Sequence, residues 1–530
     1  MLTAPAHGPY GDEAEYLAVA QEILLHGDIS FETVERTATG EVTKRRSYSK
    51  FPLGQPILLV PFATAQMTLG DFLPTRHFIL YFLPALESAG ICALIFLLLH
   101  RLGDANDHLR LSPRVAVAVS LSLGIGTQLW PSSRTLFADQ SAAFFLTLAI
   151  YALVRFRYST GHPAWLLVAA SAAGYSVLCK NIFILACPAV TVYGIWTAKN
   201  KLRTDAASAR SIALWLLLGV LPFAILAIVQ LWHNEIRYGS PSAFGYQTGR
   251  DAEYGFATPL LVGLYGIFLS SGRSIFLYSP LCILALFGAR GFFKRAPAEG
   301  ALVAGVSVPV IFVYAKWWAW HGGWEWGTRF YLFLIPVLIL PSTPVWQRLD
   351  DVSLAPVRRR LISAALGALF AISAAVQILG VAIHPASYWL ILANEVKIFE
   401  HSRYSKNVWE IRDDSVFPHF VPEFSPVAAH AWLLWATWNR NTLDDAKLSA
   451  SAPWVSLNKQ WAPRNVRPYL GYDFWFLDSG ATSNPAPVTG FVFATVLLIG
   501  LGCALLKLKR MAASDPDAVS TSQRFRRSQE

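Results

Sequence analysis

Residues 76–101, RHFILYFLPALESAGICALIFLLLHR, form an apolar stretch that begins and ends with arginine. Because about 20 helical residues cross the hydrocarbon core of a bilayer, this stretch predicts a transmembrane helix. Similar stretches recur along the chain and predict eleven spans in all. They cover residues 76–101, 114–131, 137–156, 164–180, 182–198, 211–232, 274–290, 300–316, 329–347, 361–383 and 488–506.

The composition agrees with a polytopic membrane protein. Of the 530 residues, 54% are hydrophobic and only 15% are charged, which is too apolar for one soluble core. The net charge of +10 comes from short basic tracts between apolar stretches, a pattern that reports topology and gives no sign of a nucleic-acid partner. The five cysteines all lie in apolar stretches without metal-ligand spacing, so we expect them to be core residues.

The basic tracts predict which loops face the cytoplasm. Lysine and arginine gather in every second loop, as the positive-inside rule requires of cytoplasmic loops. These tracts are Arg101/Arg110/Arg114, Arg155/Arg157, Lys199/Lys201/Arg203/Arg210, Arg290/Lys294/Arg295, Arg348/Arg358/Arg359/Arg360 and Lys507/Lys509/Arg510. We therefore expect residues 1–75, 132–136, 180–181, 233–273, 317–328 and 384–487 to face outward.

Residues 53–70 are apolar, but a span in this stretch would reverse every later loop. Three prolines at positions 52, 56 and 61 also argue against a straight crossing helix. We expect a helix lying in the outer interface, and we expect a further span upstream of Met1 to anchor the first outer segment.

The sequence thus predicts five regions. Residues 1–75 are expected to be an outer loop with a juxtamembrane helix, and residues 76–383 the transmembrane core. Residues 384–487 are expected to form an extracytoplasmic insert with eight tryptophans, residues 488–510 a last span, and residues 511–530 a disordered tail. Trp432, Trp435 and Trp438 follow a helical spacing that suits either stacking on a sugar or packing against the bilayer.

The first outer segment carries the motif Gly11-Asp12-Glu13-Ala14-Glu15-Tyr16, followed by Tyr48-Ser49-Lys50-Phe51-Pro52. Acidic residues next to a membrane are costly, so their presence suggests function. A second acid, Asp139, opens the stretch 141–153 from the outer side. Asp139 suits a helix N-cap, an active-site acid, or both.

This order of elements resembles the GT-C glycosyltransferases, in particular the protein O-mannosyltransferases and the lipid A aminoarabinose transferases. An acidic pair, a nearby tyrosine, a lysine before juxtamembrane helices and a second acid in a later loop are shared over about residues 10–350. The resemblance implies an all-α, GT-C-like helical bundle with outer juxtamembrane helices. It also implies catalytic roles for Asp12, Glu13 and Asp139, and substrate contacts for Tyr16 and Lys50.

Transfer from a lipid-phosphate sugar needs a base for the acceptor and a cation for the departing phosphate. Outer basic residues are candidates for the phosphate, although each also suits an interfacial anchor or an ion pair. They are Lys50, Arg134, Arg237, Arg273 and Arg329. The loop 317–328 adds His321, Glu325 and five tryptophans, which suit an aromatic belt or a sugar platform. His321 has no partner at metal-ligand spacing.

We therefore expect a glycosyltransferase that moves a hexose or pentose from a polyprenyl-phosphate carrier to an envelope glycan, lipid or protein. The expected place is the outer face of a bacterial inner membrane, with membrane lipids as partners and no nucleic acid. No cofactor is predicted, and a divalent metal requirement stays open. The alternatives are a transporter or flippase of a lipid-linked glycan, whose charges belong near the midplane, and an envelope scaffold.

Overall fold

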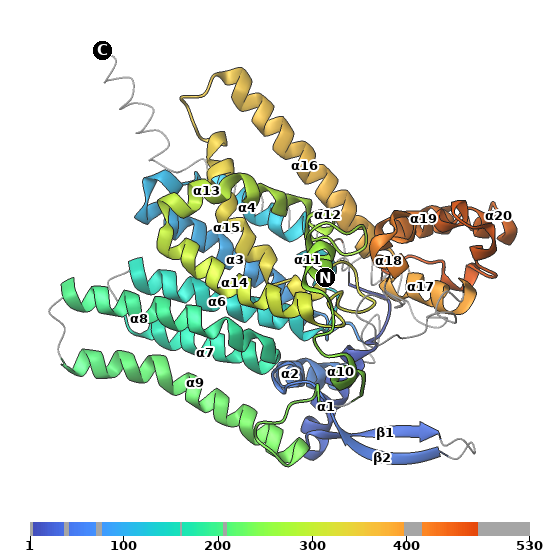
Figure 1. Ribbon diagram of the computed structural model, residues 1–530, viewed down its shortest axis with the longest axis horizontal. Coiled ribbons are helices and arrows are strands. Elements are labelled where there is room, and N and C mark those ends of the chain that lie inside the picture. Colours follow the sequence, from blue (N-terminus) through green and yellow to red (C-terminus); the bar gives the residue numbers. More distant parts are fainter. Residues whose placement is uncertain are drawn as a thin grey trace.

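The computed structural model describes residues 4–36, 42–69, 77–158, 162–204, 209–247, 249–396 and 416–474, together with residue 495. Its helices run side by side in one bundle, and a hairpin and several short helices gather at one end of it (Figure 1). The fold is that of a mainly helical, multi-pass membrane protein, as the sequence predicts, with one two-stranded hairpin in the described residues.

Six helical segments of the described chain are long and apolar enough to cross a membrane. These are Phe82–Ala105, Ala138–Tyr158, Asn181–Arg203, Leu217–Tyr238, Pro297–Lys316 and Pro356–Ala382. They lie in helices α3 (Phe82–Ala105), α6 (Ala138–Tyr158), α8 (Cys187–Thr204) with the 3-10 turn before it, α9 (Ala209–Tyr238), α14 (Pro297–Lys316) and α16 (Pro356–Ala382). Two shorter apolar helices, α4 (Pro113–Ile125) and α7 (Ala164–Cys179), stand among them.

Three predicted spans differ from single crossing helices. Residues 114–131 divide into α4 and the short helix α5 (Leu129–Ser132). Residues 274–290 divide into α12 (Ile275–Tyr278), a 3-10 turn from Pro280 and α13 (Leu284–Arg295), because proline lacks the N–H that a continuous helix needs. Residues 329–347 give a 3-10 turn and α15 (Leu334–Trp346), which contains Pro341 and Pro344. The predicted span 488–506 and the tail 511–530 lie outside the described residues.

The loops predicted to be cytoplasmic contact one another at one end of the bundle. Arg295, at the end of α13, donates to the His108 carbonyl at 2.9 Å and to Gln347 at 2.8 Å. The Ser112 hydroxyl, which also caps α4, donates to Asp350 at 2.7 Å. We call this end of the bundle the basic end.

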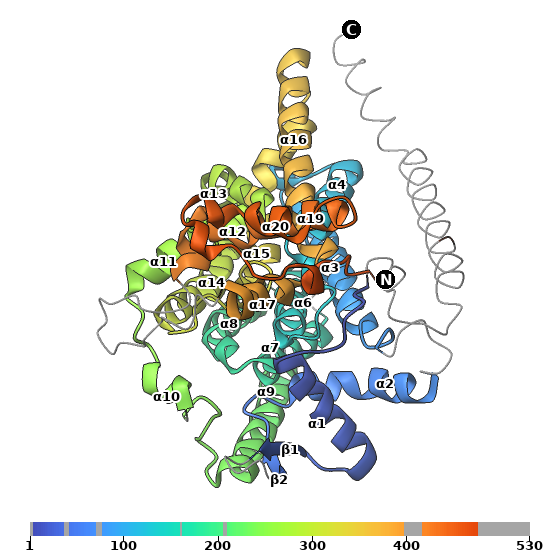
Figure 2. The same ribbon diagram turned by 90° about the vertical axis from the view of Figure 1, so that its right-hand side faces the viewer.

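The opposite end carries the first outer segment. Helix α1 (Asp12–His26) is followed by the antiparallel hairpin β1 (Ser30–Arg36) and β2 (Val42–Tyr48), in which Ser30 pairs with Tyr48. This hairpin replaces the loop that the sequence predicts between the two motifs. Helix α2 (Gly54–Leu69) follows and is a helix as expected, lying across the end of the bundle in Figure 2. We call this the site end.

Further short helices cover the site end (Figure 2). Two of them, α10 (Gly249–Tyr254) and α11 (Leu260–Phe268), come from the predicted outer loop 233–273. The described part of the insert forms α17 (Pro385–Leu390), α18 (Val416–Phe420), α19 (Pro426–Asn439) and α20 (Asp445–Ala450) around its own apolar core. Trp432 is buried in this core against Trp454, whereas Trp438 is 80% exposed, so the three predicted tryptophans do not form one stacking platform.

Candidate active site

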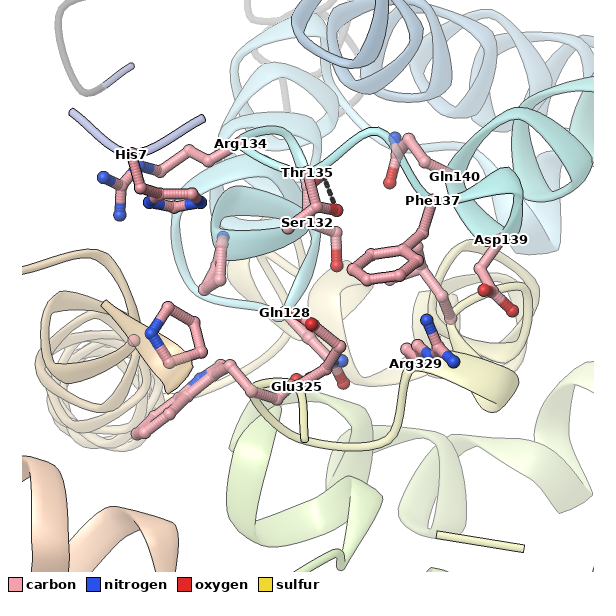
Figure 3. A pocket seen from close by; sticks show the side chains of 15 residues that line it. His7, Gln128, Ser132, Arg134, Thr135, Phe137, Asp139, Gln140, Glu325 and Arg329 are labelled. Carbon is pink, nitrogen blue, oxygen red and sulfur yellow. Dashed lines mark hydrogen bonds between the residues drawn. The ribbon is translucent and has the colours of Figure 1, made fainter. Parts of the chain in front are cut away.

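One pocket opens among the loops of the site end. It collects residues from the first segment, the loop before α6, the loop after α14 and the start of α17 (Figure 3). Its polar side chains include Asp139 and Arg329 at one end and His7 and Arg134 at the other, with Glu325 and Gln128 between them.

Asp12 begins α1 and forms an ion pair with Arg329. The Asp12 carboxylate accepts a hydrogen bond from the Arg329 guanidinium at 2.8 Å. The same guanidinium lies 4.2 Å from the ring centre of Phe137, which fixes its plane. The structure therefore joins the acid and the cation that the sequence separates by 317 positions.

Asp139 lies in the first turn of α6 and forms an ion pair with Lys180. Asp139 therefore lies inside the helix and is not its N-cap. A negative charge in the first turn is stabilised by the partial positive charge of the helix N-terminus. Lys180 follows α7 and stands 4.1 Å from the ring centre of Phe330, next to Arg329. Lys180 was not among the residues predicted for the site, although a lysine in the turn between two apolar helices was a signal.

Two buried glutamates flank the Asp12–Arg329 pair. The Tyr10 hydroxyl donates to Glu325 at 2.6 Å, and Glu13 accepts the backbone N–H of Leu136 at 2.8 Å. Burial raises the pKa of Glu325 to about 7, partly offset by Arg329. Burial, helped by the charge of Glu325, also raises the pKa of Glu13 well above its ordinary value. Glu13 thus ties α1 to the loop before α6, which is a positioning contact.

Lys50 lies at the rim and is half-exposed. Its ammonium group pairs with Asp251 of α10 at 3.0 Å and stands 5.5 Å from the ring centre of Tyr246. The negative charges of Asp12, Asp251 and Asp139 act on Tyr246. The structure therefore places Lys50 beside the site and does not place it among the pocket residues.

Three predicted phosphate-binding arginines are held by protein groups instead. Arg134 pairs with Asp473 at 2.9 Å. Arg237 donates to the carbonyls of Ser49 and Phe51 at 2.8 and 2.9 Å. Arg273 is fully buried and donates to the carbonyls of Gly323, Glu325 and Gly327. These contacts position the first segment and the loop 317–328. We therefore propose no phosphate-binding role for these three arginines.

The remaining predicted contacts lie around the pocket. Tyr16 is buried and packs against Phe51, with ring centres 5.0 Å apart. His321 stacks on His419 at 4.4 Å and accepts the Gly323 N–H at 3.1 Å, outside the pocket lining. Among the described residues, no group of three or more histidine, cysteine or acidic side chains is placed to hold a metal ion.

No protein-family model and no curated protein matches the chain. Similar solved structures include ArnT from Cupriavidus metallidurans, in the apo state (TM-score 0.42, 11% identity, 87% of this chain and 70% of that chain) and bound to undecaprenyl phosphate (0.42, 14%, 87% and 73%). Another is the archaeal oligosaccharyltransferase AglB from Archaeoglobus fulgidus in complex with an inhibitory peptide and a dolichol-phosphate (0.46, 12%, 74% and 56%).

These similar structures belong to the GT-C superfamily, the group that the sequence resembles. Their TM-scores lie below 0.5 and their identities below 15%, so these structures support no conclusion about the side chains of this protein.

Proposed function

We propose that the chain is a membrane glycosyltransferase that takes a sugar from a polyprenyl-phosphate carrier. The main support for this proposal is two neighbouring ion pairs at one end of a bundle of apolar helices. Asp12 pairs with Arg329, and Asp139 pairs with Lys180. A carboxylate and a cation in one place are the minimum that such a transfer needs.

In the proposed reaction the bond between the anomeric carbon and the carrier's phosphate oxygen breaks. A bond between the same carbon and an acceptor hydroxyl oxygen forms, and the hydroxyl proton passes to the carboxylate of Asp12. Positive charge develops at the anomeric carbon, where the carboxylate of Asp139 stabilises it. The bonding electrons leave with the polyprenyl phosphate, whose growing negative charge Arg329 and Lys180 stabilise.

The surroundings of Asp12 support this division of roles. Arg329 is held on Phe137 and Lys180 on Phe330, so both cations are pre-positioned before any substrate binds. The side chain of Asp12 is about one-third exposed, so an incoming hydroxyl can reach it.

The transporter or flippase alternative places its charges differently. Such proteins carry their binding charges near the bilayer midplane, on broken helices. In this chain the ion pairs lie at helix ends: Asp139 in the first turn of α6 and Lys180 just after α7. This placement favours chemistry at one membrane face. We propose the outer face of a bacterial inner membrane, with an envelope glycan, lipid or protein as acceptor.

Replacement of the base tests the proposal. Asp12→Asn keeps the shape of the side chain and removes its basicity, so transfer from a radiolabelled polyprenyl-phosphate sugar in membranes should fall about 10²–10⁴-fold. Asp28→Asn is the matched control, because Asp28 lies just after α1 and pairs with Ser30 and Arg46 of the hairpin. A folded Asp12→Asn protein with normal turnover would refute the assignment.

A further inference from the structure

His7 forms the end of the pocket that lies away from Asp139 and Arg329 (Figure 3). Its Nδ1 atom lies 2.8 and 2.9 Å from the two carboxylate oxygens of Asp473. The same carboxylate accepts the backbone N–H groups of Ala6 at 3.1 Å and His7 at 3.3 Å. The histidine is therefore fixed in position by a residue 466 positions later.

Asp473 is itself held as an anion. It is 4% exposed and pairs with the Arg134 guanidinium at 2.9 Å. Burial raises the pKa of Asp473, but His7 and Arg134 outweigh it and hold that pKa well below the usual range. A carboxylate that is ionised only accepts hydrogen bonds, so Nδ1 of His7 carries a proton.

In the neutral ring, this arrangement leaves the other nitrogen as an acceptor. Nε2 of His7 is buried and has no hydrogen-bond partner among the described residues. A buried polar atom without a partner is costly, and such atoms are normally satisfied by water or by a ligand. The His7 ring is held in edge contact with His384, 3.9 Å between ring centres, so it is not free to turn toward another partner.

We propose that His7, oriented by Asp473, forms the acceptor subsite of the pocket, where its Nε2 accepts a hydrogen bond from a hydroxyl group of a carbohydrate acceptor. This inference rests on the proposed function. The phosphate of the donor needs cations, and Arg329, next to Lys180, stands at the other end of the pocket. Arg134, the cation beside His7, is 4% exposed and donates both to the Asp473 carboxylate and to the carbonyls of Val381 and Asp473, so this end suits a neutral hydroxyl.

Two substitutions separate the two ring nitrogens. His7→Asn keeps an amide N–H near the position of Nδ1 and removes Nε2, whereas His7→Gln keeps a polar group near Nε2 and gives up the contact with Asp473. In a transfer assay, we expect His7→Asn to raise the KM for the acceptor about tenfold or more. The KM for the lipid donor should change by less than about twofold, since binding at the other end is intact. His7→Gln should retain part of the acceptor affinity.

A second measurement does not depend on turnover. Purified protein labelled with ¹⁵N-histidine and placed in nanodiscs should show a neutral His7 with its proton on Nδ1, assigned by the signal that disappears in His7→Asn. Asp473→Asn should abolish this tautomer preference. A role in packing alone would not require either result.

The outcomes distinguish the two proposals. An active His7→Asn protein with an unchanged acceptor KM overturns the subsite, and so does a proton found on Nε2 in the wild type. A wild-type protein that transfers no sugar refutes the proposed function instead, and the tautomer measurement then decides on His7 alone.

Discussion

Arg329 has contacts that no other described cation combines. Its guanidinium binds the Asp12 carboxylate, lies on the Phe137 ring and acts on the buried carboxyl of Glu325. A planar group with several fixed N–H donors can hold a carboxylate and turn toward a phosphate without leaving its place. The chemistry of the site therefore depends on the shape of this cation as well as on its charge.

Arg329→Lys keeps the charge and removes the planar fork. We expect transfer to fall about 10²-fold, because one pre-positioned group that stabilises the leaving phosphate is lost. Arg295→Lys, which changes an arginine at the basic end, is the matched control and should leave turnover intact. Equal activity of the two variants would show that the fork of Arg329 is unimportant.

The Asp139–Lys180 pair is almost fully buried, with side-chain exposures of 7% and 13%. Removal of one partner leaves an unpaired buried charge, so Asp139→Asn and Lys180→Met should each lower the free energy of unfolding by about 3 kcal/mol. The double variant should lose less than the sum of the two, as a double-mutant cycle measures. Strictly additive losses in detergent-solubilised protein would contradict a direct pair.

Glu325 predicts a pH dependence of stability. Because burial raises its pKa to about 7, the folded protein binds this proton more tightly than the unfolded chain does. The associated stability is present below the ordinary glutamate pKa and is lost as the pH rises through about 7. The thermal unfolding temperature should therefore decrease as the pH rises from about 4.5 to about 7. Glu325→Gln should flatten this dependence of the unfolding temperature on pH. A wild-type curve that rises over this window contradicts the prediction.

At the scale of elements, the loop 317–333 carries both Glu325 and Arg329 and is shaped by glycine. Gly322, Gly323 and Gly327 have φ values of 80°, 84° and 67°, which other residues rarely adopt. Arg273 binds three carbonyls of this loop. Backbone conformation and a buried arginine together set where Arg329 meets Asp12.

Gly327→Ala should disturb this loop. The added methyl group would stand 2.7 Å from the Gln128 side chain, at a backbone angle that alanine avoids. We expect a loss of about 1–3 kcal/mol in unfolding free energy and a lower turnover. Gly367→Ala in α16 is the control, because nothing lies within 4 Å of the added atom. That change should be neutral or stabilising, since alanine favours a helix.

Sequence patterns predicted the long apolar helices well, because their length and composition alone suit a bilayer. The sequence patterns failed where a proline divides an apolar stretch, as at Pro280. Hydropathy measures only how apolar a residue is, and it does not show that proline lacks the backbone N–H of a continuous helix. The hairpin 30–48 was missed because it pairs over polar, charged residues. The contact between Asp12 and Arg329, and the partners Lys180, His7 and Asp473, depend on long-range packing that one sequence does not display.

At the scale of the whole molecule, the loops sort to two ends of the bundle. Asp12, Asp139 and Arg329 lie at the site end. At the basic end, Arg157 pairs with Glu299, and Arg295 contacts the neighbouring loop. The helices α3, α6 and α14 each run from one end to the other. This sorting matches the charge alternation in the sequence, from which the orientation in the membrane follows as a prediction.

Cysteine labelling tests that orientation. In a background without the five native cysteines, Lys44→Cys places a thiol on the hairpin at the site end, and Asp107→Cys places one at the basic end. The native side chains are 68% and 85% exposed, so both positions are accessible. A membrane-impermeant maleimide added to intact cells should label Lys44→Cys alone, and Asp107→Cys should react only after the membrane is permeabilised. The positive-inside rule places the basic loops on the cytoplasmic side. Labelling of Asp107→Cys in intact cells would therefore show that the protein has the opposite orientation. The Asp12–Arg329 pair would then face the cytoplasm, and an outer-face acceptor would be excluded.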